Sequence, residues 1–152
     1  MSAKIVEAAL GDVPAILEFI RELARFEKLE HEVVATEESL RESLFGPRKY
    51  AEVVFVEEKG ERVGFALFFH NYSTFLGKPG LYLEDVYVRR EARGRGYGKL
   101  LMSHLARVAL AHGCGRLECG RSTGMRVRST STVRLAPSGC RTGPCTDCRA
   151  RR

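Results

Sequence analysis

Two carboxylates stand side by side at Glu84 and Asp85, in a stretch that is otherwise apolar or aromatic. A carboxylate can take a proton from an alkylammonium group, whose pKa is about 10, and its charge also attracts that cation. Successive side chains of a strand alternate between its two faces, so one of the pair could instead point away from any site. Such a pair can act as a general base or as an electrostatic site for a cation, and Glu84 is favoured as a base over a purely electrostatic role.

A glycine-rich turn follows at residues 93–99, which read Arg-Gly-Arg-Gly-Tyr-Gly-Lys. Glycine lets a backbone turn tightly and approach a ligand closely, and the first N–H groups of a following helix favour an anion such as a pyrophosphate. A Walker loop would need Ser or Thr where Leu100 stands, and a dinucleotide fingerprint would need glycine where Lys99 stands. The turn therefore predicts an anion site of another kind.

The helices and strands that must position these residues can be predicted along most of the chain. Asp12 and Thr36 are the expected N-caps of the first two helices, and residues 71–80 are expected to form a loop. The apolar spacing predicts strands at 4–8, 53–57, 62–70, 81–88 and from 116 onward, and helices at 13–24, 37–44 and 99–112.

The motifs in these elements resemble those of one family. Arg93-x-x-Gly96-x-Gly98 resembles the acetyl-CoA signature R/Q-x-x-G-x-G/A of the GNAT N-acetyltransferase superfamily. Residues 16–46 and 63–88 resemble its diamine (spermidine/spermine) and thialysine branch, with the R-E-L-A-x-x-E opening, the Y-x-T-x-x-G-K-like loop and the Y-L-E-D strand. The resemblance covers about residues 4 to 118.

The resemblance implies a fold and an activity. The fold would be α/β, a mixed and mostly antiparallel sheet with helices on both faces, commonly as a homodimer. The reaction would move an acetyl group from acetyl-CoA to a primary amine of a polyamine or amino-acid-like substrate, by direct attack and without a metal. Rival functions are a non-catalytic acyl-CoA-binding remnant and a nucleic-acid binder.

The resemblance also implies residue roles. Glu84 and Asp85 would face the amine as catalytic and substrate-binding groups, and Val86 and Val88 would pair their backbone with the pantetheine arm. Arg93 would lie at the phosphates, and backbone N–H groups of the turn would hold the pyrophosphate. Glu27 and Glu30 would line a substrate channel, although a solvated acidic loop explains them equally well. The expected cofactor-binding residues are Val86, Tyr87, Val88, Arg93, Gly94, Arg95, Gly96, Tyr97, Gly98 and Lys99.

The net charge of +6 comes from the last part of the chain, because residues 119–152 carry +7 and residues 1–118 carry −1. We therefore expect an acetyltransferase domain at 1–118, incomplete at its C-terminus, and an arginine-rich tail at 119–152 that is disordered or out of frame. Only the tail would favour nucleic acid, which makes such a partner unexpected. The chain shows neither a membrane-length apolar run nor a signal peptide, and its five cysteines are an odd number. These features predict a cytoplasmic protein.

The tail departs from the family pattern. Members continue roughly W-x-V-x-x-W-N-x-P-A-I-x-F-Y-x-S-L-G-A, and the tyrosine of that segment is the usual acid for the departing thiolate, whereas this chain has no tyrosine after Tyr97. Allowed codons for residues 119–137, read from the third base of the Cys119 codon, give W-S-V-D-W-N-A-R-P-F-D-F-Y-R-S-L-G-A. We therefore predict a frameshift near Cys119, in preference to a zinc site at the three nearby tail cysteines, which are one ligand short.

Overall fold

The computed structural model describes residues 3–121 and 129–134, with the backbone alone for Arg121 and residues 129–134. Six strands form one sheet in sequential order, antiparallel at every junction except the parallel pair β4–β5. The strands are β1 (Lys4–Glu7), β2 (Glu52–Glu58), β3 (Glu61–Ser73), β4 (Lys78–Val88), β5 (Arg116–Arg121) and β6 (Ser129–Arg134). Three α-helices and three 3-10 turns complete the described part: α1 (Val13–Phe26), α2 (Glu37–Phe45), α3 (Tyr97–Ala111), η1 (Leu10–Asp12), η2 (Glu30–Glu32) and η3 (Arg90–Ala92).

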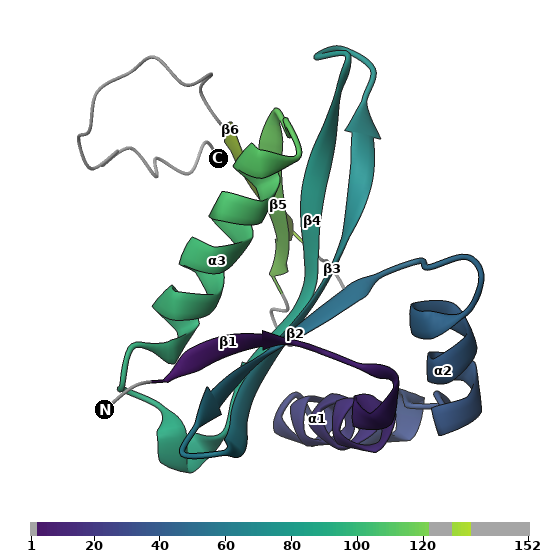
Figure 1. Ribbon diagram of the computed structural model, residues 1–152, viewed down its shortest axis with the longest axis vertical. Helices are drawn as coiled ribbons and strands as arrows, with labels where there is room; N and C mark the ends of the chain where they lie inside the picture. The colour runs from purple at the N-terminus through teal and green to yellow at the C-terminus, as the bar shows by residue number, and fades with distance from the viewer. Residues whose placement is uncertain (1–2, 122–128, 135–152) are drawn as a thin grey trace.

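The helices cover opposite faces of the sheet, α3 on one and α1 with α2 on the other (Figure 1). Alternation along β2 divides its side chains between the two layers: Val54 and Val56 pack with α3, whereas Val53 and Phe55 pack with α1 and α2. The expected mixed, mostly antiparallel sheet with helices on both faces is confirmed.

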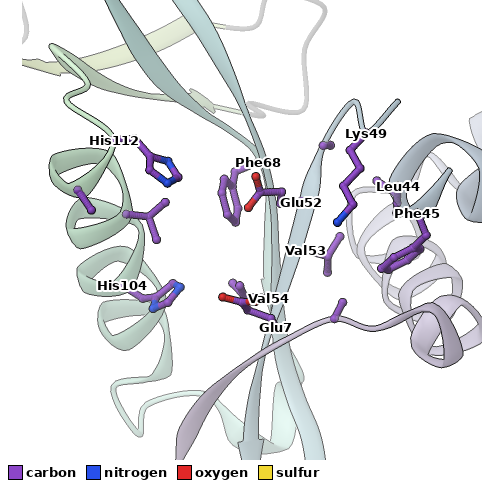
Figure 2. A pocket seen from close by; sticks show the side chains of 14 residues that line it. Glu7, Leu44, Phe45, Lys49, Glu52, Val53, Val54, Phe68, His104 and His112 are labelled. Atoms are coloured by element: carbon purple, nitrogen blue, oxygen red, sulfur yellow. The ribbon is translucent and has the colours of Figure 1, made fainter. Parts of the chain in front are cut away.

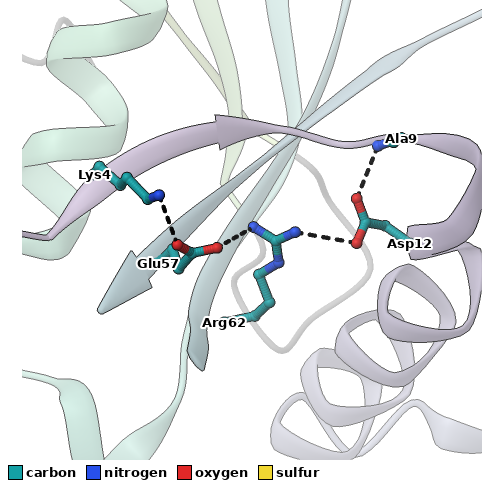
Figure 3. Close-up of polar contacts among 5 residues, drawn as sticks. All are labelled: Lys4, Ala9, Asp12, Glu57 and Arg62. Carbon is teal, nitrogen blue, oxygen red and sulfur yellow. Dashed lines mark hydrogen bonds and ion pairs between the residues drawn. The ribbon is translucent and has the colours of Figure 1, made fainter. Parts of the chain in front are cut away.

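The two predicted helix caps differ in outcome. Thr36 caps α2, because its hydroxyl accepts the N–H of Ser39 at 3.2 Å. Asp12 does not cap α1: its carboxylate instead accepts the N–H of Ala9 at 2.8 Å and pairs with Arg62 at 3.1 Å (Figure 3). The nearby guanidinium, which also binds Glu57 at 2.9 Å, turns this carboxylate away from α1.

The expected loop at 71–80 is wrong, because most of it continues the β3–β4 hairpin. Asn71 pairs with Gly80, Tyr72 with Pro79 and Ser73 with Lys78, which leaves a short turn ending at Gly77, with φ of +61°. Polar and aromatic residues such as Asn71 and Tyr72 can extend a hairpin beyond the apolar core, so composition alone does not mark its end.

The sheet also extends beyond the domain boundary expected at residue 118. β5 runs to Arg121 and pairs with β6 from Arg116↔Arg134 to Arg121↔Ser129. The first part of the arginine-rich tail therefore contributes two strand segments to the same sheet. Residues 122–128 and 135–152 lie outside the described residues, and the out-of-frame interpretation of the tail stays a prediction.

Candidate active site

The site begins where β4 and β5 separate. The parallel register runs from Gly80↔Arg116 to Leu83↔Cys119, and beyond that point β5 pairs with β6 alone among the described strands. The C-terminal half of β4, residues 84–88, is therefore paired with β3 on one side and open on the other. An open strand edge can receive an extended ligand that pairs with the backbone.

The backbone of Val86 and Val88 faces this open edge. The N–H of Arg89 donates to the carbonyl of Val63 at 2.9 Å, and Val88 stands opposite Gly64. In an antiparallel ladder this pattern turns the N–H and C=O groups of Val88, and of Val86 two residues earlier, away from β3. Both backbone groups of Val86 and the N–H of Val88 thus point to the open edge, where the Val88 carbonyl accepts from Arg93 Nε at 2.9 Å.

A β-bulge in β4 presents Glu84 and Asp85 together. Phe68 pairs with Leu83 and Leu67 with Asp85, so Glu84 is the extra residue of the bulge. Both residues line a cavity of about 240 Å³, and the bulge interrupts the strict alternation of side chains at this point of β4. Glu27, directly after α1, lines the same cavity. Three acidic residues from two elements thus meet beside the open edge.

Glu30, the other expected channel residue, is placed differently. It lies in η2, outside the described lining of that cavity, and its carboxylate pairs with Arg25 at 3.0 Å. The hydrogen bond from the guanidinium lowers the pKa of Glu30. The exposed pair with Arg25 fits the alternative in which Glu30 belongs to a solvated acidic surface.

The glycine-rich turn has the backbone expected of an anion site. Gly94 and Gly96 have φ of +79° and +84°, a region that glycine enters without strain. α3 begins at Tyr97, two residues before the expected start, and the N–H of Leu100 donates to the carbonyl of Gly96 at 3.0 Å. The N–H groups of residues 97–99, which include Gly98 and Lys99, lie in the first turn of α3. No earlier turn of the helix supplies carbonyl acceptors for them.

The side chains of the turn contact protein groups. Arg95 donates to Glu58 at 2.9 Å, and a hydrogen bond from Tyr97 is the main cause of the lowered pKa of Glu58; the same contact raises the pKa of Tyr97. Arg93 donates through Nε to the carbonyl of Val88 at 2.9 Å. The side chains of Arg93, Arg95 and Tyr97 are thus engaged with groups of the protein.

Tyr87 has a packing role. Its ring meets Phe19 edge-on at 6.4 Å and lies 6.2 Å from Phe26, both on α1. Its partner across the ladder is Phe65 on β3, so its backbone faces away from the open edge.

Comparison with known proteins assigns this chain to a family. Residues 16–129 match the family described as "Acetyltransferase (GNAT) family". The chain belongs to the GNAT acetyltransferase family. Members of this family transfer an acetyl group from acetyl-CoA, and the curated relatives of this chain include thialysine and ornithine N-acetyltransferases.

The relatives in the GNAT family include enzymes of defined amine specificity. A thialysine N-epsilon-acetyltransferase of Bos taurus is 41% identical over 121 residues, which cover 74% of this chain and 71% of that protein. An L-ornithine N5-acetyltransferase of Arabidopsis thaliana is 32% identical and covers 78% of this chain and 72% of that protein. Among solved structures, an integron cassette protein of V. cholerae has a TM-score of 0.65 at 27% identity, covering 81% of this chain and 77% of that one.

The structure adds lining residues that sequence reasoning missed. Leu23, Met102, Cys119 and Gly120 complete the walls of the acidic cavity. A Cβ built on Gly120 would lie 3.1 Å from the hydroxyl of Tyr82, so glycine here keeps β5 close to β4. The spacing of strands in the sequence could not show this approach, because it depends on where β4 and β5 diverge.

A larger cavity of about 400 Å³ lies elsewhere, between α3 and the start of β2 (Figure 2). None of the residues expected to bind cofactor or substrate lines it. His104 faces it, and burial lowers the pKa of this imidazole. The acidic cavity at the open edge of β4 is the smaller of the two.

Within residues 3–121 and 129–134, no group of three or more His, Cys, Asp or Glu side chains is arranged to hold a metal ion. None of the helices in that part of the chain has the length and apolarity to cross a membrane.

Proposed function

We propose that this GNAT chain acetylates a primary amine of a short polyamine or an amino-acid-like substrate, held by Glu27, Glu84 and Asp85. The observation that carries the proposal is the cavity that these three carboxylates line at the open edge of β4. A cluster of negative charge favours a substrate with more than one cationic group. The relatives named for thialysine and ornithine support this class, because both compounds carry an amine on a short chain.

Acetyl-CoA would lie along the open edge. Its pantetheine arm would pair with the backbone of Val86 and Val88, and its pyrophosphate would meet the N–H groups at the start of α3. The cavity begins at Leu83 and Glu84, next to that edge, so the thioester and the amine would meet at the bulge. The N–H groups of α3 and the two valines are thus the cofactor-binding groups, and Arg95 and Tyr97 hold the turn through Glu58.

The reaction would proceed by direct attack. Glu84, directly or through a water, takes a proton from the ammonium group, and the freed nitrogen lone pair attacks the thioester carbonyl. The C–N bond forms, the C–S bond breaks, and the CoA thiolate takes a proton to leave as the thiol. The family tyrosine that donates this last proton has no counterpart after Tyr97 in this chain.

The test is acetyl transfer from acetyl-CoA to thialysine, L-ornithine and spermidine. Glu84→Gln should lower kcat by about 10²- to 10⁴-fold, the usual contribution of a general base. Glu27→Gln should mainly raise KM for the amine. Glu30→Gln is the matched control, since Glu30 is paired with Arg25 outside the cavity. Equal losses in Glu84→Gln and Glu30→Gln would contradict the assignment.

Calorimetry separates the rival functions. CoA binding without acetylation of any of the three amines would identify a non-catalytic acyl-CoA-binding protein. Salt-dependent DNA binding that disappears on truncation after Glu118 would identify a nucleic-acid-binding tail. Either result, without acetyl transfer, would overturn the proposal.

Assembly and location complete the proposal. We infer a homodimer in the cytoplasm, from the resemblance to the diamine and thialysine branch and from the odd number of cysteines. Sedimentation equilibrium tests the dimer, because a monomer would have a mass of 17.0 kDa. Fractionation of cells that produce the natural protein tests the location.

A further inference from the structure

We propose that Arg93 is a positioning residue that fixes the C-terminal end of α1, and with it Glu27, against the open edge of β4. The inference rests on the proposed function in one respect only, the assignment of Glu27 to the amine. It differs from the expected role of Arg93 at the phosphates, because the contacts of its side chain lie with α1 and β4.

Arg93 joins β4 to α1. Its Nε donates to the carbonyl of Val88 at 2.9 Å, and its guanidinium carbon lies 4.5 Å from the ring centre of Phe26 and 5.3 Å from that of Tyr87. A guanidinium within about 6 Å of a ring centre is attracted by the ring electrons. Phe26 is the last residue of α1, so the contact reaches the end of that helix.

The end of α1 has few other apolar anchors at this position. Phe26 is 56% exposed, although it is a large apolar residue. Lys28, two residues later, has φ of +62°, a region that residues with a side chain rarely adopt. The N–H of Leu29 donates to the carbonyl of Ala24 at 2.8 Å, the local bonding that commonly accompanies a left-handed residue after a helix. The contact of Arg93 with Phe26 adds a tertiary restraint one residue before Glu27.

The charges around Arg93 fit this role better than that of a free phosphate ligand. Arg93 lines a cavity of about 340 Å³ with Arg25 and Arg90. Arg25 is paired with Glu30 at 3.0 Å, and Glu22 in the same lining pairs with Arg89 at 3.0 Å. Arg93 instead places its charge over two aromatic rings, which is the arrangement of a packing contact.

The consequence is a link between the two substrates. The carbonyl of Val88 faces the edge where we place the pantetheine arm, and Arg93 holds both that carbonyl and Phe26. Loss of the guanidinium should therefore loosen Glu27 and weaken binding of the amine, while the backbone N–H groups that bind the pyrophosphate stay in place.

Hydrogen exchange of the full chain tests the anchor without any ligand. The N–H groups of Glu27 and Leu29, which donate to Leu23 and Ala24 at 2.9 and 2.8 Å, report on the end of α1. In Arg93→Gln and Phe26→Leu both should exchange roughly two- to five-fold faster, as loss of an exposed cation–π contact predicts. The N–H of Gly46 at the end of α2 is the internal reference, and should not change. Unchanged exchange at Glu27 and Leu29 in both variants would overturn the proposal.

Calorimetry with CoA and thialysine provides the second readout. Arg93→Gln and Phe26→Leu should each weaken thialysine binding roughly two- to five-fold, and the double variant should be no worse than either. Arg93→Lys should restore part of the loss. Arg90→Gln, which removes a charge from the same cavity, should leave thialysine binding within a factor of about two.

The outcomes separate the two proposals. A wild-type chain that binds no thialysine would contradict the proposed function, and exchange at Glu27 would still decide the anchor. A tenfold loss of CoA binding in Arg93→Gln, with normal exchange at Glu27, would place the side chain at the phosphates and overturn the inference.

Discussion

The two halves of β4 have the same neighbour on one side and opposite surroundings on the other. Residues 80–83 lie between β3 and β5, and Leu81 and Leu83 are buried under α3. Residues 84–88 keep β3 but lose β5, and Val86 is 41% exposed. The difference begins at the bulge of Glu84. The first half of β4 thus anchors the core, and the second half is the part that the proposed function assigns to the ligands.

The largest effect should come from restoring the family segment that the frameshift prediction places after Cys119. A gene corrected by one base near the Cys119 codon would encode the tryptophan, asparagine and tyrosine run of the family. We expect the corrected protein to acetylate thialysine about 10²- to 10⁴-fold faster, because it regains an acid for the thiolate. Sequencing of the source DNA and the intact mass of the natural protein provide the check. A natural protein with the present tail and full activity would contradict the frameshift.

Alanine substitution of one side chain in each half of β4 should show that the two halves contribute differently to stability. Leu81→Ala should lower the free energy of unfolding by about 2–5 kcal/mol, because this fully buried side chain leaves a cavity. Val86→Ala should change it by only about 0.5 kcal/mol, as is usual for surface positions. Urea denaturation measures both. Similar losses in the two variants would mean that the second half is covered as well as the first.

Alanine substitutions at two glycines of the turn should have opposite effects on stability and the same effect on CoA binding. Gly96→Ala should cost about 1–2 kcal/mol, since φ of +84° is unfavourable for alanine even though its Cβ would have space. Gly98→Ala, within α3 and also with open space, should stabilise the protein by about 0.5–1 kcal/mol. Both methyl groups should weaken CoA binding by about tenfold or more, because they stand where a phosphate must approach. Unchanged CoA affinity in Gly98→Ala would remove the turn from the cofactor site.

The smallest effect concerns pH. The hydrogen bond from Tyr97 is the main reason that the pKa of Glu58 lies below its ordinary value, with the charge of Arg95 adding to it. The ionised carboxylate therefore contributes stability above about pH 4.3, where an unfolded glutamate is charged, and the contribution disappears as pH falls through the lowered pKa. Glu58→Gln should lower Tm at neutral pH and give a shallower decline of Tm in acid. Parallel Tm curves for both proteins would contradict this assignment.

Most of the fold was accessible from the sequence, because apolar periodicity and turn residues mark its strands and helices. The errors occurred where a long-range partner decides the structure. Asp12 bonds to Ala9 and Arg62 instead of capping α1, and Asn71 extends a hairpin whose end carries few apolar residues. Arg62 lies 50 residues from Asp12, a separation that local patterns do not report.

The site was predictable in its chemistry and less so in its geometry. The residue types at Glu84, Asp85 and the glycine turn indicate an amine and an anion. The bulge that puts both carboxylates into one cavity, and the divergence of β5 that opens the edge, depend on strand register. Arg93 is the clearest example of a contact that the sequence did not predict. Its motif indicates a phosphate ligand, whereas its side chain packs on Phe26.

The most direct test of the contrast within β4 is a map of amide chemical shifts when CoA is added to the ¹⁵N-labelled chain. The account predicts the largest changes at Val86 and Val88 and at residues 94–99, with little change at Leu81. The largest changes around His104 and the larger cavity, with β4 undisturbed, would contradict it.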